Sequence, residues 1–284
     1  MSKLLDDLKF QYRAGGIVQK LIYWNVGISV IIMLLQVFFS SFSASLLSWL
    51  ALGSNPMSLL YKPWTLLTYS FVHAGVIHLL FNMIVLFFVG RLFATFFTDK
   101  QFLTLYLLGA LLGGVIFLLG GMFMSTGSIL VGASAATIAP LVGVAVHAPM
   151  MQVRLALIGN VKMWHIATFI IILDVIQLNT SNVGGHLAHL GGALMGLIYI
   201  KMLEAGTDLS IIFDKISNLF KRNQGTRFKK VYVNNKENRR ETTVSENKDE
   251  RQQKIDKILD KISKSGYESL TKEEKDFLFR AGKE

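Results

Sequence analysis

The sequence predicts an all-α polytopic membrane protein, with six transmembrane helices followed by a small helical cytoplasmic region. Hydrophobic residues make up 52% of the 284 residues and charged residues only 17%, whereas soluble domains carry about 25% charged residues. Between residues 21 and 200 there are few charges, and six apolar stretches have about the length that crosses a bilayer. The charged residues in that range are Lys62, Arg91, Asp99, Lys100, Arg154, Lys162 and Asp174.

Residues 1–20 are expected to form a cytoplasmic N-terminal segment. They lack the charged stub, short apolar run and small-residue cleavage site of a removable signal peptide, so targeting is assigned to the first spanning helix. The sequence contains no cysteine, which excludes disulfides, thiol catalysis and thiolate metal sites.

A six-helix domain is expected over residues 21–203. Its apolar segments run approximately over residues 22–42, 75–96, 102–124, 132–149, 164–178 and 184–203, and the fifth is the shortest. Residues 43–72, between the first two segments, are also apolar, but Gly53-Ser54-Asn55-Pro56 and Lys62 make them a poor seventh span. Their tryptophans and tyrosines favour a position in the membrane interface.

The lysines and arginines predict that both termini are cytoplasmic. Basic residues precede the first segment, flank the turn between the second and third, lie between the fourth and fifth, and begin the tail. The alternate loops contain Lys62 as their only basic residue. The second, fourth and sixth helices therefore run from outside to inside.

Residues 204–250 are expected to form a basic juxtamembrane linker. Nine lysines and arginines and a single glutamate fall between residues 215 and 240. Such a stretch attracts anionic lipid headgroups at the inner leaflet, which is favoured here over nucleic-acid binding. Residues 231–250 have the polar composition of a disordered linker.

Residues 251–284 are expected to form a small helical hairpin. Four apolar residues fall on one helix face, and Gly266 follows as a C-terminal stop. Thr271 and Glu274 have the spacing of a capping box that opens a second helix. The apolar face consists of Ile255, Ile258, Leu259 and Ile262.

Polar side chains inside spanning helices are costly, and three groups of them fall at corresponding places. His78 and Asn82 lie near the start of the second segment. Ser134 lies near the start of the fourth, and His189 near the start of the sixth. Because these helices share one direction and rise 1.5 Å per residue, all four side chains lie within roughly 10 Å of the outer helix ends. Their common depth predicts a single site.

These residue types suit acyl transfer. A serine hydroxyl becomes a good nucleophile when a base takes its proton, and histidine is the base suited to neutral pH. Asparagine and histidine can donate hydrogen bonds to the oxyanion that forms when an amide is attacked. No carboxylate is expected at this depth, so a Ser–His dyad is favoured over a triad. Taken singly, each group is explained by helix packing or an inter-helix hydrogen bond, but four at one depth favour a site.

Over roughly residues 10–203 the chain resembles the rhomboid intramembrane proteases. The resemblance rests on three motifs in the expected order: His73-x4-His78-x3-Asn82, Gly132-Ala133-Ser134 and Ala188-His189-Leu-Gly-Gly192.

The resemblance implies a six-helix rhomboid bundle with Ser134 as nucleophile and His189 as general base. It further implies an oxyanion hole made by His78, Asn82 and the backbone amide of Ser134. The implied substrates are single-pass membrane proteins cut near their membrane boundary, with no metal or cofactor. The expected location is a bacterial cytoplasmic membrane.

Three residues depart from the family pattern. Ala135 follows the nucleophile where the family usually has glycine, and Thr65 follows Trp64 where many relatives have arginine. Ile138 stands where some relatives use a tyrosine that stacks on the catalytic histidine. Since none of these removes a reacting group, an active enzyme is favoured. The alternative is an inactive rhomboid-like protein that binds client transmembrane helices.

Three further polar residues are not assigned to catalysis. His73 is expected at a loop-to-helix junction, bonded to the first loop. His186 shares a helix face with His189, and these two histidines, with His73 and His78 as further ligands, raise the alternative of a metal-binding protein or transporter. The absence of a His-Glu-x-x-His sequence argues against metal. Asp174 lines a cavity, bonds a neighbouring helix, or marks an early end of the fifth span.

Overall fold

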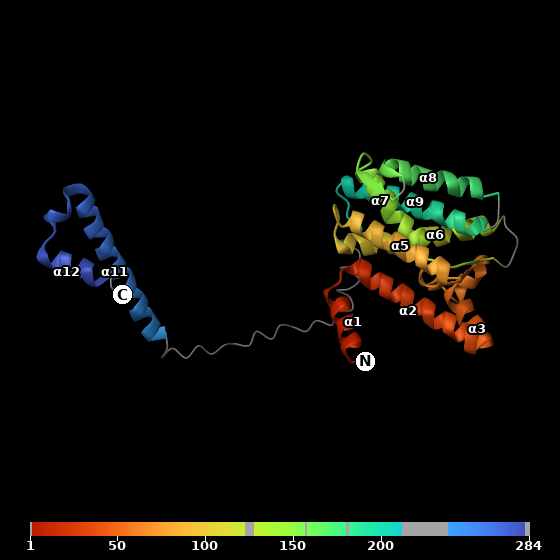
Figure 1. The fold of residues 1–284 in the computed structure, drawn as a ribbon, viewed down its shortest axis with the longest axis horizontal. Helices are drawn as coiled ribbons and strands as arrows, with labels where there is room; N and C mark the ends of the chain where they lie inside the picture. The colour runs from red at the N-terminus through yellow and green to blue at the C-terminus, as the bar shows by residue number, and fades with distance from the viewer. Residues whose placement is uncertain (1, 123–127, 157, 180–181, 212–237, 282–284) are drawn as a thin grey trace. The chain divides into compact units, whose positions relative to one another are not determined.

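The structure is a computed structural model that describes residues 2–122, 128–156, 158–179, 182–211 and 238–281. The chain divides into two compact units, Met1–Arg222 and Asn223–Glu284, and each is described by itself. The first unit carries the apolar helices, which run alongside one another with α2 and α8 at opposite sides (Figure 1). The predicted all-α polytopic fold with a C-terminal helical part is confirmed.

The first unit contains nine described helices and two short β-ladders. The helices are α1 (Ser2–Ala14), α2 (Ile17–Phe38), α3 (Ser40–Leu50), α4 (Thr65–Thr68), α5 (Val76–Phe93), α6 (Asp99–Gly121), α7 (Ser134–His147), α8 (Met163–Gln177) and α9 (Val183–Glu204). The 3-10 turns η1 (Pro56–Leu60) and η2 (Tyr69–Phe71) lie between α3 and α5. The antiparallel pairs are β1 (Leu52–Gly53) with β2 (Ile129–Leu130) and β3 (Gln152–Leu155) with β4 (Gly159–Lys162).

Four of the described helices, α2, α5, α6 and α9, are long and apolar enough to cross a membrane. The other two predicted segments form α7 and α8, which are apolar but have only 14 and 15 residues. The predicted bounds of the first segment were wrong, because α2 begins at Ile17 and ends at Phe38. The carboxylate of Asp99 accepts a hydrogen bond from the Ile17 amide at 2.9 Å. That cap comes from 82 residues away, so local sequence does not reveal it.

Small residues bring α6, α7 and α9 into close contact. A Cβ added at Gly192 of α9 would lie 2.2 Å from the carbonyl oxygen of Ala135, and one at Gly196 would lie 2.3 Å from that of Ala139. A Cβ at Gly113 of α6 would lie 2.7 Å from the Ala135 side chain. The backbone of α7 is therefore held directly against both neighbours, which leaves little freedom at its N-terminal end.

The segment expected to lie in the membrane interface contains a helix that was not predicted, α3. The last carbonyls of a helix have no partner within it, and here side chains from the following segment supply donors. Lys62 Nζ donates to Ser48 O at 2.9 Å, and Trp64 Nε1 donates to Trp49 O at 2.8 Å. These bonds hold the segment together, and the β1–β2 pairing ties it to the residues that precede α7.

The second unit is a helical hairpin of α11 (Asn238–Ser265), η3 (Tyr267–Ser269) and α12 (Lys272–Ala281). Gly266 stops α11 with a φ of 78°, as predicted. The capping box is confirmed, because the Glu274 amide donates to Thr271 Oγ1 at 3.3 Å and the Thr271 amide donates to the Glu274 carboxylate at 2.8 Å. Lys261 Nζ also donates to that carboxylate, which joins the two helices.

The predicted linker was wrong at its C-terminal end, because residues 238–250 are helical. Their polar composition shows no apolar face, but glutamate, lysine, arginine and glutamine are good helix formers. The basic stretch predicted to bind anionic lipid lies mostly at residues 212–237, outside the described residues.

Candidate active site

The N-terminal ends of α5, α7 and α9 meet at a cavity of about 670 Å³. Apolar side chains make up most of its wall, including Phe81, Val85, Leu141 and Ile170. The titratable and nucleophilic side chains on the wall are His78, Ser134, Asp174, His186 and His189. A largely apolar cavity with a few convergent polar groups is the usual form of a binding or active site.

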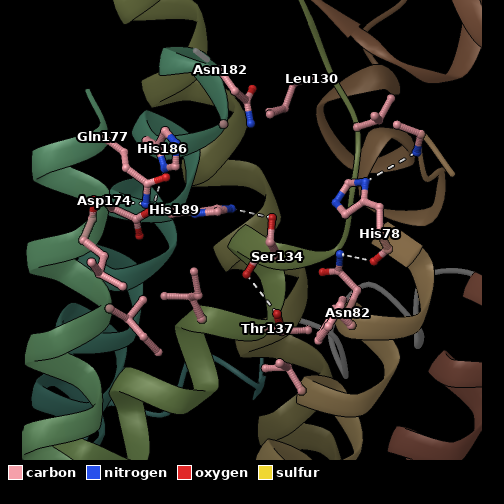
Figure 2. Close-up of a pocket in the computed structure, with 18 of the residues that line it drawn as sticks. His78, Asn82, Leu130, Ser134, Thr137, Asp174, Gln177, Asn182, His186 and His189 are labelled. Carbon is pink, nitrogen blue, oxygen red and sulfur yellow. Dashed lines mark hydrogen bonds and ion pairs between the residues drawn. The ribbon is translucent and has the colours of Figure 1, made fainter. Parts of the chain in front are cut away.

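Ser134 stands at the centre of this group (Figure 2). It is the first residue of α7, so its backbone N–H has no carbonyl partner within the helix. The preceding Gly132 has a φ of 119°, a conformation that residues with a Cβ rarely adopt. This turn presents both the hydroxyl and the amide of Ser134 at the positive end of the helix dipole, where negative charge is stabilised.

His189 lies one helical turn before Gly192, at the point where α9 contacts α7. Its Nε2 is 2.7 Å from Ser134 Oγ, although 55 residues separate the two in sequence. A histidine nitrogen at this distance can take the hydroxyl proton. The structure therefore brings together the two residues that the sequence singled out as base and nucleophile.

His78 and Asn82 lie one turn apart on α5, across Ser134 from His189 (Figure 2). Asn82 Nδ2 donates to the His78 carbonyl at 2.9 Å, which uses one of its two N–H groups. The Ala74 amide donates to His78 Nδ1 at 3.4 Å, so a neutral imidazole carries its proton on Nε2. Both side chains thus retain a donor in a cavity that also holds the Ser134 hydroxyl.

Asp174 of α8 belongs to this group, although the sequence analysis left it outside the catalytic residues. Two of the alternatives considered for it are found together, because it lines the cavity and is bonded to α9. The expectation that no carboxylate lies at the depth of the cluster is wrong, because its Oδ1 is 2.8 Å from His189 Nδ1 and 2.8 Å from His186 Nδ1. Its side chain is buried. One signal was present: an acid within an apolar span requires a partner, and histidines are the nearest candidates.

His73 is bonded differently from the expectation. Its Nδ1 is 2.9 Å from Ser29 Oγ of α2, and its Nε2 accepts a hydrogen bond from the Ala133 amide at 3.4 Å. The ring is buried and stands edge-on to His78, with centroids 5.1 Å apart. His73 thus contacts the residue immediately before the candidate nucleophile.

The three departures from the family pattern are accommodated in the structure. The Ala135 methyl lies in the space that Gly113 leaves open. Ile138 is buried and lines the cavity. The Thr65 hydroxyl donates to the Lys62 carbonyl at 2.7 Å, so it stabilises its own segment.

Three of these groups have the donor chemistry to hold a metal ion. The ligand atoms of Asp174, His186 and His189 lie within 4.8 Å of one another. This set differs from the four-histidine arrangement considered from sequence, because His73 is bonded to Ser29 and Ala133 instead. In the present arrangement both histidines are hydrogen-bonded to the carboxylate.

Two families match the chain. Residues 61–205, just over half of it, match a family described as Rhomboid domain, and this range includes every residue on the wall of the cavity. Residues 241–283 match a family of unknown function, DUF6576, which spans most of the helical hairpin. Among curated proteins none matches the chain. With its several apolar helices the protein is a multi-pass membrane protein, and it belongs to the rhomboid family.

Proposed function

We propose that this protein is an intramembrane serine endopeptidase that cleaves membrane proteins within or beside their transmembrane segments. The observation that carries the proposal is the 2.7 Å separation of His189 Nε2 and Ser134 Oγ on the wall of an apolar cavity. Family membership supports a protease.

The reaction begins when His189 takes the Ser134 proton and Oγ attacks the substrate carbonyl carbon. The carbonyl oxygen becomes an oxyanion, for which the Ser134 amide, His78 and Asn82 are the donors. Preorganised donors of this kind lower the barrier because they require no reorganisation as charge develops. His189 then gives its proton to the leaving amine, and an acyl-enzyme remains on Ser134.

Water completes the cycle. His189 takes a proton from a water molecule that attacks the acyl carbon, and the ester bond to Ser134 breaks. The proton returns to Oγ, which regenerates the enzyme. Apart from the substrate and this water molecule, every group in these steps belongs to the chain itself.

The positions of the basic residues support a site near the outer face of the membrane. Arg91, Lys100 and Lys201 lie on α5, α6 and α9 at the helix ends away from the cavity, and Arg154 and Lys162 lie on the β3–β4 hairpin. Since basic residues mark the cytoplasmic side, we propose that both termini are cytoplasmic and that the protein resides in a cytoplasmic membrane. In that orientation the basic sequence of residues 215–240 would meet the inner leaflet, and we propose anionic lipid headgroups as its partners.

The proposal is tested by cleavage of a single-pass transmembrane reporter in liposomes. Wild-type protein is compared with Ser134→Ala and His189→Ala, and Ser45→Ala, an exposed serine of α3, is the matched control. We expect cleavage by the wild type and the control alone, with unchanged melting temperatures.

A fluorophosphonate probe separates the alternatives. Labelling of the wild type at Ser134 supports an activated nucleophile independently of reporter choice. If the wild type is neither labelled nor active, the protein is a rhomboid-like binder of transmembrane helices. If Ser134→Ala cleaves like the wild type, the proposed chemistry is wrong.

A further inference from the structure

A single carboxylate oxygen lies between two imidazoles. Asp174 Oδ1 is 2.8 Å from Nδ1 of His189 and equally 2.8 Å from Nδ1 of His186. The two rings are nearly perpendicular, at 88°, with their centroids 5.8 Å apart. Asp174 and His186 are both buried, so solvent does not compete strongly for these bonds.

This arrangement determines where the protons lie. An ionised carboxylate only accepts hydrogen bonds, whereas a protonated one would donate through one of its oxygens. Two nitrogens directed at the same oxygen therefore both act as donors to an ionised Asp174. When neutral, each imidazole then carries its proton on Nδ1. The lone pair of His189 Nε2 is left facing Ser134 Oγ, which is the tautomer that a general base needs.

We propose that Asp174 is a positioning residue for His189, and that His186 shares its carboxylate and so limits the negative charge available to His189. The inference rests on the proposed function and deepens it. Asp174 touches neither substrate nor reacting atoms, and it acts by holding the ring and its tautomer. When His189 takes the Ser134 proton, the resulting imidazolium is paired with the carboxylate.

His186 opposes this stabilisation. The hydrogen bond from His186 Nδ1 withdraws electron density from the Asp174 oxygen that faces His189. Protonation of His186 would also place a second positive charge beside the His189 imidazolium. The titratable groups that face His189 are Asp174 of α8, His186 of its own helix and His78 of α5. Of these, Asp174 and His186 are bonded together.

Substitutions of Asp174 and of His186 are therefore expected to shift the acid limb of the pH profile of kcat/KM in opposite directions. Asp174→Asn removes the charge that stabilises the imidazolium, so the acid limb moves to lower pH. The amide can also donate to Nδ1 and stabilise the wrong tautomer, so kcat falls at least about tenfold with KM nearly unchanged. Asp174→Glu restores a carboxylate, and with it part of the rate.

Removing His186 has the reverse effect on the profile. His186→Leu eliminates both its N–H donor and its charge, so the acid limb moves to higher pH. His186→Gln retains a donor but cannot be protonated, and gives a smaller shift in the same direction. His165→Gln, at the opposite end of α8 and exposed, is the matched histidine control and leaves the profile unchanged.

The experiment measures reporter cleavage and the rate of fluorophosphonate labelling from about pH 5 to 9, with melting temperatures alongside. Opposite shifts for the Asp174 and His186 variants support the proposal. A lower melting temperature without any shift of the acid limb would show a purely structural role and overturn it. Failure of the proposed function is distinguishable, because the wild type would then be neither active nor labelled, or Ser134→Ala would cleave like the wild type, whatever the Asp174 variants do.

Discussion

A Cβ added to Gly132 would stand 2.7 Å from Cε1 of the His78 imidazole, so the backbone before Ser134 packs directly on that ring. Gly132 also has a φ of 119°, where a residue with a Cβ is strained by about 1–3 kcal/mol. Gly132→Ala is therefore expected to displace His78 or the Ser134 amide. We predict a fall in kcat of at least about tenfold in reporter cleavage, because both groups are the proposed oxyanion donors.

Gly53→Ala is the control for this substitution. Gly53 lies in β1, a Cβ there would meet nothing within 4 Å, and its φ is not in the left-handed region. Its activity should equal that of the wild type. A fully active Gly132→Ala protein would show that the contact with His78 has no part in catalysis.

His78 and Asn82 are predicted to act on the transition state. His78→Phe and Asn82→Leu keep the approximate side-chain volume but remove the donors. Each should lower kcat by about 10²–10³-fold and change KM little, as expected for donors that act on the oxyanion. The double variant should lose less than the product of the two effects, because the donors serve one oxygen.

Single-turnover and steady-state kinetics on the same reporter show whether His78 and Asn82 act on the transition state or on substrate binding. A raised KM with unchanged kcat would place His78 and Asn82 in substrate binding instead. The melting temperature of each variant shows whether any loss of activity comes from loss of fold.

The grouping of four polar side chains at the candidate site was predictable from sequence, whereas the place of Asp174 beside His189 was not. Ser134, His189, His78 and Asn82 occupy equivalent positions in three helices of one direction, and helix geometry alone converts those positions into a common depth. Asp174 belongs to a helix of the opposite direction. Its depth depends on how far α8 is displaced along α9, which is a property of packing.

The differences in fold have similar causes. The start of α2 depends on a cap from Asp99, and the end of α3 on donors from Lys62 and Trp64. Such partners lie far away in sequence and leave no local periodicity. The start of α11 was missed for another reason, since a polar helix without an apolar face has the composition of a linker.

The contact between α7 and α9 leads to a prediction about stability. A Cβ at Gly192 would lie 2.2 Å from the Ala135 carbonyl oxygen, which is backbone and cannot move aside. Gly192→Ala should therefore force the helices apart, at a cost of about 1–3 kcal/mol. We expect a lower melting temperature in detergent and a loss of activity, because His189 and Ser134 lie on these two helices.

Gly27→Ala provides the matched comparison within a spanning helix. Gly27 lies on α2, and a Cβ there would meet nothing within 4 Å. The melting temperature of this variant should be unchanged or slightly raised, since alanine favours helix more than glycine does. Equal effects of the two substitutions would contradict close packing of α7 on α9.

The last prediction concerns the stack of Trp49 and Trp64, whose rings are 5.8 Å apart and nearly parallel. Trp64 Nε1 also donates to the Trp49 carbonyl, so this residue combines a ring contact with a hydrogen bond. Trp64→Phe retains an aromatic ring and loses the bond, which is expected to cost about 1 kcal/mol. Trp64→Leu loses both, with a further cost of about 0.5–1.5 kcal/mol from the stack.

In thermal unfolding followed by circular dichroism, the melting temperature should be highest for the wild type, lower for Trp64→Phe and lowest for Trp64→Leu. Tyr61→Leu is the control, because Tyr61 is 76% exposed in the same segment. The stack lies outside the cavity, so kcat measured well below the transition should be unchanged in all three variants. If Tyr61→Leu destabilises as much as Trp64→Leu, exposed aromatic area stabilises this segment, and the pairing of Trp64 with Trp49 does not.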